Sequence, residues 1–528
     1  MKAKTLLYNG RIYTQAYGLH VDSLAIYKNR IVAIGNRLQH DPDFRSYSHL
    51  DLKGKTVVPG FVDAHTHFYY FALSLGRINL DGVDSLEKCL KKIHAFAANQ
   101  PKDAWIVGDG YAPDRFVKRI EPDRFMLDSV TGGRPAFLFS KDQHTAWVNS
   151  RALEITGLDQ NTPDPEGGKI ERWANRAPSG LLREGPAYMP VLARVPSPSK
   201  REIDRRYRMA LDYTYRKGVT GVHSFDGPDA FPYFAELAEQ SKIGLRINYY
   251  PGAKLLPNLI ANRTYYGSGT EFFRIAGIKL FADGSLGSQT AFCYKKYIGS
   301  RDNCGIETTP VDEMHRAAVQ AAKLGLPCCI HAIGDKAVTN VLDALETAPT
   351  LHFGARHRIE HLQLVRPSDI KRIAQLNIVA SMQPSHCPSD IPLMRKYWGT
   401  RGASAFVFRT LISRGVDLAF GSDVPIEPLD PIAGIAAAVR RARPKTNDVF
   451  YAKQRLTASE ALYFFTVGPA IAAGQAHCRG FLLPGYPADI VIIDRDITKV
   501  AAAKIYDIQP LATVLDGEVK FSDSSLKL

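Results

Sequence analysis

The feature that most constrains the fold is an alternation of short apolar runs with amphipathic stretches from about residue 205 onward. This pattern is typical of βαβ units, which build parallel sheets covered by helices. With one earlier run, the expected strands are VVPGFVDAH (57–65), GVTGVHSF (218–225), LRINYY (245–250), RIAGIKLFADG (274–284), PCCIHAIG (327–334), RHRIEHLQL (356–364), NIVASMQP (377–384) and VDLAFGSD (416–423). Eight parallel strands can close into a barrel with its chemistry at the carboxyl ends. We therefore predict an α/β protein built on a distorted (β/α)8 barrel.

Both ends of the chain have a different pattern from the barrel. The first 57 residues alternate in short runs with turn signals such as Asn9-Gly10, and we expect antiparallel strands there. Near the other end, RGFLLPGYPADIVIID and ATVLDGEVKFS return to strand patterning. We predict that residues 1–57 and 475–528 form one composite β-sandwich and that residues 58–474 form the barrel.

The segment between the first two barrel strands is about 150 residues long. A βα connection is normally much shorter, so this segment must carry structure of its own. We predict a cap-like insert at residues 77–205, inside the barrel domain.

Composition argues against several classes of partner. The formal net charge of +14 comes from 67 Lys plus Arg against 53 Asp plus Glu, but the basic residues form no long run. They are explained more simply as solvated helix faces than as a nucleic-acid surface. Seven cysteines without a C-x-x-C motif, and the lack of a signal-like start or a long apolar segment, predict a cytoplasmic protein without membrane contact. Composition does not decide whether the protein forms a homo-oligomer.

The end of the first barrel strand carries His65-Thr66-His67. Imidazoles at i and i+2 of an extended chain point to the same side and can hold one cation together. An isolated H-x-H is a weak signal, because single histidines are more often structural.

Further candidates recur at the ends of later strands. They are Lys279 in GIKLFADGS, His331 in CIHAIGD, His361 in RIEHLQL and Asp423 in FGSDVP. Five of the six residues are types that bind Zn²⁺ through nitrogen or oxygen, and all fall where a barrel builds its site. The sequence therefore predicts a metal site.

These motifs resemble the amidohydrolase superfamily. The stretches VVPGFVDAHTHF, QHTAWVNSRAL, KLFADGSLGS, IHAIGDKAV, RIEHLQL, QPSH and FGSDVPIEPLDP are similar to the amidohydrolase-3 branch, which includes N-substituted formamide deformylase. The resemblance implies that His65 and His67 bind a more buried metal and that His331 and His361 bind a more exposed one. It also implies that Asp423 contacts the metal and takes the proton of the attacking water.

The same resemblance places Lys279 in the bridging position of the metal site. An ordinary ammonium could not lie between two cations, because like charges repel and it has no lone pair to donate. The resemblance therefore implies that Lys279 is carbamylated to N6-carboxylysine. One or two divalent ions are expected, with zinc favoured by the imidazole ligands.

Other polar residues in these motifs are candidates for substrate binding: His144, Glu184, His223 and His386. Each could equally be a core or supporting hydrogen bonder. Two departures from the branch bear on specificity, namely Gln289 where an arginine is usual, and Ser224-Phe225 where an aspartate usually follows the histidine.

The function predicted from these residues is metal-dependent hydrolysis of a C–N bond in a small molecule, either an amide, a formamide or a cyclic amide. A deaminase of an aminated heterocycle is the nearest alternative, because both reactions begin by adding activated water to carbon. A catalytically silent binding protein on the same fold is the alternative from another class.

Overall fold

The structure is a computed structural model that describes residues 2–526 apart from residues 17–19, 114–115, 117–119, 142, 144, 352–353 and 445. The chain divides into two compact units. One comprises Met1–Tyr69 and Leu211–Leu528, and the other is Tyr70–Ala210.

Strands from both termini share one sheet in the larger unit. Its order is β25-β24-β23-β7-β2-β3, so strands near residue 500 pair with strands near residue 57. The bounds are Arg11–Tyr13 for β2, His20–Val21 for β3, Thr56–Pro59 for β7, Ile490–Ile493 for β23, Pro510–Leu515 for β24 and Glu518–Ser522 for β25. Alternate residues such as Ile490 and Ile492 are buried in a cluster with Leu7, Ile26 and Val57.

A second terminal sheet has the order β5-β4-β1-β6, with bounds Lys4–Tyr8 for β1, Ser23–Tyr27 for β4, Arg30–Gly35 for β5 and Ser48–Asp51 for β6. The expectation of purely antiparallel strands was wrong here. β1 pairs with β6 in parallel, and β2 pairs with β7 in parallel. The reason is that the chain crosses between the two sheets three times, between β1 and β2, between β3 and β4 and between β6 and β7, which brings like-directed strands together.

The centre of the larger unit consists of two parallel sheets with the orders β17-β16-β15-β8 and β18-β19-β20-β21-β22. The bounds are Phe61–Thr66 (β8), Val219–Ser224 (β15), Arg246–Tyr249 (β16), Phe273–Ile275 (β17), Ile278–Phe281 (β18), Cys328–Ala332 (β19), Arg358–His361 (β20), Val379–Met382 (β21) and Leu418–Phe420 (β22). Almost every residue of these strands is buried, which explains why the sequence shows continuous apolar runs rather than alternation.

The expected closed barrel is not seen, because the two parallel sheets are open. Among the described residues, their backbones pair only through the single bridges Gly252↔Lys279 and Thr66↔Val424. At the first seam the expected strand 274–284 breaks after β17 and resumes in β18. Gly277 lies in this break, packed so tightly that an added Cβ would lie 2.7 Å from the Pro327 carbonyl oxygen.

At the second seam, a side chain replaces a ladder hydrogen bond. Asp63 Oδ1 accepts the backbone N–H groups of His65 and Ser422, at 3.1 and 2.9 Å. The backbone pairing of β8 with the chain after β22 is therefore local rather than continuous.

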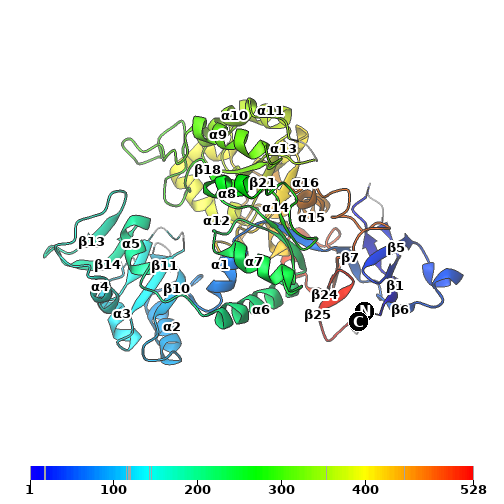
Figure 1. Ribbon diagram of the computed structural model, residues 1–528, viewed down its shortest axis with the longest axis horizontal. Coiled ribbons are helices and arrows are strands. Elements are labelled where there is room, and N and C mark those ends of the chain that lie inside the picture. Colours follow the sequence, from blue (N-terminus) through cyan, green and yellow to red (C-terminus); the bar gives the residue numbers. More distant parts are fainter. Residues whose placement is uncertain are drawn as a thin grey trace. The chain divides into compact units, whose positions relative to one another are not determined.

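Helices flank the parallel strands, as Figure 1 shows for α9, α10 and α11. Helix α9 buries Met314, Ala318 and Ala321, which recur at helical spacing. The helices of this unit are α7 Ala230–Glu239, α8 Leu256–Ala261, α9 Val311–Ala322, α10 Asp335–Glu346, α11 Pro367–Gln375, α12 His386–Leu393, α13 Phe408–Ser413, α14 Pro431–Arg440, α15 Ala458–Phe464 and α16 Val467–Ala472.

The smaller unit has its own sheet and core. The sheet order is β13-β14-β12-β11-β10-β9, with β9 Ile78–Asn79, β10 Ile106–Tyr111, β11 Ala136–Ser140, β12 Thr145–Val148, β13 Lys169–Arg172 and β14 Pro178–Arg183. Its helices are α2 Leu86–Ala98, α3 Arg124–Thr131, α4 Ser150–Thr156 and α5 Gly185–Leu192. Helices α1 Phe68–Ser74 and α6 Lys200–Arg216 span the boundaries between the units.

The helices in the described part of the chain were also compared with the length and hydropathy that membrane crossing requires. None of those described helices combines enough length with enough apolar character to span a bilayer.

Candidate metal centre

Neighbouring parallel strands bring the predicted ligands to one edge. In the ladder, Phe281 is opposite His331 and Ala332 is opposite His361, so β18, β19 and β20 end side by side. His65 lies near the end of β8, and Asp423 follows β22. The sequence order of these residues is scattered, but the parallel topology collects them at the carboxyl ends of their strands.

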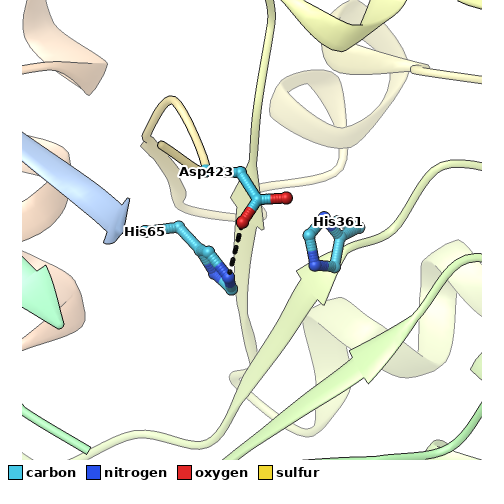
Figure 2. A group of neighbouring side chains, drawn as sticks. All are labelled: His65, His361 and Asp423. Carbon is cyan, nitrogen blue, oxygen red and sulfur yellow. Dashed lines mark ion pairs between the residues drawn. The ribbon is translucent and has the colours of Figure 1, made fainter. Parts of the chain in front are cut away.

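Three of the residues form a compact donor group, shown in Figure 2. One ligand atom each from His65, His361 and Asp423 lies within 4.8 Å of the other two, and all three residues are buried. His65 Nε2 is 3.5 Å from Asp423 Oδ1. Donor atoms bound at about 2.0–2.2 Å around one Zn²⁺ are separated by similar distances. The donor set therefore fits a divalent cation.

The backbone at two of these ligands is in the left-handed region. φ is 72° at His361 and 66° at Asp423. Non-glycine residues adopt this conformation at a cost and often do so at functional sites. Asp423 is fixed there by its own N–H, which donates to the His65 carbonyl oxygen at 2.7 Å.

The hydrogen bonds of the histidines leave lone pairs for a metal. His65 Nδ1 donates to Glu360 Oε2 at 2.6 Å, so Nε2 keeps its lone pair. His331 Nε2 donates to the Gly284 carbonyl oxygen at 3.0 Å, so Nδ1 keeps its lone pair. Among the described residues, His361 Nδ1 is buried without a hydrogen-bond partner.

Burial also keeps these rings neutral. It lowers the pKa of His65 to about 4 and that of His331 to about 3, with the Lys279 charge acting in the same direction. Burial likewise places the pKa of His361 well below its ordinary value. Neutral imidazole is the form that binds metal ions.

Asp423 is surrounded by imidazoles. His67 Nε2 is 3.4 Å from its Oδ1, and His386 Nε2 is 3.7 Å from its Oδ2. Burial opposes ionisation of Asp423, but the hydrogen bond with His67 and the neighbouring histidines outweigh it and hold its pKa well below the usual range. The carboxylate is therefore ionised and can accept a proton.

Lys279 is 4% exposed, and within the described chain its Nζ has no hydrogen-bond partner. The Nζ atom lies 4.8 Å from the ring centres of both Phe225 and Phe281. Burial lowers the pKa of Lys279 to about 8, although Glu360 and Asp423 act against the shift. A buried amine without a partner is unusual, because desolvation is not compensated.

Sequence reasoning missed the buried pair that supports His65. Arg358 and Glu360 are both fully buried, with Arg358 Nε 2.8 Å from Glu360 Oε1. Burial opposes ionisation of Glu360, but the Arg358 charge and the His65 hydrogen bond hold its pKa well below its usual range. The signal in the sequence was the strand RIEH, in which two charged residues, Arg358 and Glu360, occupy alternate positions of a buried strand and therefore need partners.

Two buried aspartates were missed as well. Asp63 accepts N–H groups at the seam between the sheets, and Asp283 accepts those of Phe292, Ile333 and Gly334. Burial raises the pKa of each carboxyl to about 7, against these hydrogen bonds. They hold the loops that carry the ligands.

The predicted substrate-binding residues have different positions. His386 lies beside Asp423, as described above. His223 is fully buried, and its Nδ1 accepts from Arg358 Nη1 at 2.7 Å. Glu184 precedes α5 in the smaller unit, and His144 lies outside the described residues.

Comparison with known proteins agrees with this geometry. The amidohydrolase family pattern matches residues 49–521. The chain is 32% identical over 540 aligned positions to the protein LONG AFTER FAR-RED 3 of Arabidopsis thaliana, covering 98% of this chain and 91% of that protein. It is 26% identical to the N-substituted formamide deformylase of Arthrobacter pascens, covering 89% of each.

A solved structure supports the same conclusion. An uncharacterised metal-dependent hydrolase from Pyrococcus furiosus superposes with a TM-score of 0.77 at 30% identity, covering 94% of this chain and all of that chain. Family and structural likeness together support a hydrolase that uses a divalent metal. The chain belongs to the amidohydrolase family.

Proposed function

We propose that this protein hydrolyses a C–N bond of a small molecule, either an amide, a formamide or a cyclic amide. The observation that carries the proposal is the convergence of His65, His361 and Asp423 at the strand ends. We infer that the two open sheets are halves of a distorted (β/α)8 barrel, and that residues 77–205 are a cap-like insert within it.

A divalent ion in this site, with zinc favoured, would supply Lewis acidity that lowers the pKa of water and polarises a carbonyl group. His65, His67, His331 and His361 would hold one or two such ions. Asp423 takes a proton from the attacking water and later gives it to the leaving nitrogen. We propose that His386, which lies 3.7 Å from Asp423 Oδ2, contacts the substrate or shares that proton.

We propose further that Lys279 is carbamylated. Its neutral amine attacks CO₂, a C–N bond forms, and a proton is released to solvent. The product is an anion with two oxygen donors in the position of a buried amine that has no hydrogen-bond partner among the described residues. It would replace a repulsive ammonium with ligand oxygens between the histidine pairs.

The proposed substrate is a small molecule, and the proposed location of the protein is the cytoplasm. A homo-oligomer is a possible assembly. One relative is a deformylase by name, which favours formamides among the candidates. His144 and Glu184 are proposed as further substrate contacts. Loss of the usual arginine at Gln289 favours a less anionic substrate.

The test is a panel of formamides, N-acyl amines and aminated heterocycles incubated with metal-loaded protein. Amine or carboxylate release supports the proposal, and ammonia release from a heterocycle supports the deaminase alternative. A chelated sample is the control, because metal removal should abolish turnover. Absence of hydrolysis across the whole panel in protein shown to hold metal would favour the silent binding protein.

A further inference from the structure

A cavity lies beside β8, β15 and β16, and its lining residues include none of the donor group His65, His361 and Asp423. Its volume is about 40 Å³, whereas one buried water needs about 10–15 Å³. The polar residues that line it include His223, Asn248, Arg274, Gln475 and Arg479. It therefore has room for a molecule larger than one water.

His223 presents a hydrogen-bond donor to this cavity. Its Nδ1 lies 2.7 Å from Arg358 Nη1, and a guanidinium has donors only, so Nδ1 must be the acceptor. The ring proton is therefore on Nε2. This atom is buried and has no hydrogen-bond partner in the described chain, while the whole residue is 0% exposed.

Asn248 presents an acceptor beside it. Asn248 is opposite His223 in the parallel ladder, so their side chains project from neighbouring strands to the same side. Its Nδ2 donates to Gln475 Oε1 at 3.1 Å, which leaves Oδ1 without a partner among the described residues. At 8% exposure, Asn248 is also more than nine-tenths buried.

The charged side chains around the cavity include one arginine that no described carboxylate offsets. Arg246 pairs with Asp489 and Asp516, and both Arg30 and Arg479 pair with Glu271, so three arginines offset three carboxylates. Arg274 has no ion pair in the part of the chain that the structure describes, and its guanidinium lies 4.9 Å from the ring centre of Tyr266. Arg274 and His223 both line the cavity, and after burial and Arg358 the Arg274 charge also helps to hold the pKa of His223 well below its ordinary value.

We propose that this cavity binds a small monoanionic oxyanion that keeps at least one hydroxyl group, as bicarbonate and dihydrogen phosphate do. The anion accepts hydrogen bonds from His223 Nε2 and the Arg274 guanidinium, and its hydroxyl donates to Asn248 Oδ1. Burying an anion is costly unless it is paired and hydrogen-bonded, and this cavity supplies both conditions. The inference does not depend on the proposed hydrolytic function.

The experiment is calorimetric titration of the full-length, metal-loaded protein with phosphate at slightly acidic pH, with chloride as the ionic-strength control. We expect Arg274→Gln to weaken phosphate binding about tenfold or more, because charge-assisted hydrogen bonds are lost. Arg301→Gln, at a side chain that is 98% exposed, should leave binding unchanged. Because the metal centre is the same in both variants, the difference between them reports the cavity.

Separate titrations with bicarbonate and formate distinguish the ligand sources. Formate lacks the hydroxyl group and should bind more weakly than either hydroxylated anion. A crystal structure of unmodified protein grown in phosphate supplies a measurement that needs no variant. Equal phosphate affinity in both variants, or density for water alone in the cavity, overturns the proposal.

Discussion

Asp423 combines an ionised carboxylate, contacts with three imidazoles and a fixed left-handed backbone. Asp423→Asn keeps the size of the side chain but removes its ability to accept a proton. We expect kcat to fall by about 10²- to 10⁴-fold, the usual contribution of general acid–base catalysis. Elemental analysis should show that most of the metal is retained.

The matched control is Asp302→Asn, because Asp302 is 77% exposed and far more accessible than Asp423. Its turnover should equal that of the unmodified protein. Near-normal turnover in Asp423→Asn would transfer the proton role to another group, with His386 the nearest candidate.

Lys279 gives a second prediction at the scale of one residue. Lys279→Ala removes the buried side chain from between Phe225 and Phe281 and should lower both metal content and turnover. If a carbamate is the active form, a short carboxylic acid added with bicarbonate should restore part of each. Intact-mass analysis under non-acidic conditions should show the added CO₂, and full activity with an unmodified lysine would contradict the prediction.

A third prediction concerns Glu360, which orients His65 as a metal ligand. Glu360→Gln weakens the 2.6 Å hydrogen bond that fixes the Nδ1–H tautomer of His65. Partners of this kind typically contribute about 10- to 100-fold to metal affinity, so a loss in that range is expected in a chelator competition. Glu346→Gln, at a side chain that is 56% exposed, is the control.

A merely structural role for Glu360 predicts a different outcome. Arg358 would lose a buried partner in Glu360→Gln, and thermal stability would fall while the metal affinity of the folded protein stayed unchanged. Measuring unfolding and metal competition on the same sample separates the two roles.

At the scale of elements, the sequence predicted the parallel strands and the strand ends where donors gather. This was possible because buried parallel strands are continuous apolar runs, and because His65, His361 and Asp423 interrupt those runs with polar side chains. Family resemblance, rather than spacing, supplied the roles of Lys279 and Asp423.

The breaks between the sheets could not be predicted from the sequence. The break before β18 depends on the contact of Gly277 with Pro327, 50 positions away in the chain. The pairing of Glu360 with His65 joins residues separated by 295 positions. Such contacts arise from tertiary packing, which local propensity and periodicity do not encode.

The seam between β8 and β22 gives a prediction at the scale of elements. An added Cβ at Gly421 would lie 2.4 Å from the His65 backbone nitrogen and 2.7 Å from Asp63 Oδ1. Gly421→Ala should therefore displace the end of β8 and reduce metal binding. Gly287→Ala, where no atom lies within 4 Å of the added Cβ, should bind metal normally, and equal metal content in the two variants would contradict this view of the seam.

At the scale of the whole molecule, the terminal sheet ties residues near 57 to residues near 492 and directly precedes β8. Ile492 is fully buried there, opposite Val57 on one neighbouring strand and Ala512 on the other. Ile492→Ala should lower the free energy of unfolding by about 2–5 kcal/mol, through lost burial and the cavity left behind.

Chemical denaturation of the metal-loaded protein measures this loss, with Ile306→Ala as the control because Ile306 is 54% exposed. The control should unfold like the unmodified protein, since surface substitutions usually change stability by less than about 0.5 kcal/mol. If both ends of the chain stabilise one cooperative unit, the transition that releases the metal should shift together with the unfolding of the terminal sheet. Two separate transitions, with metal release unaffected by Ile492→Ala, would show that the sheet and the metal centre unfold independently.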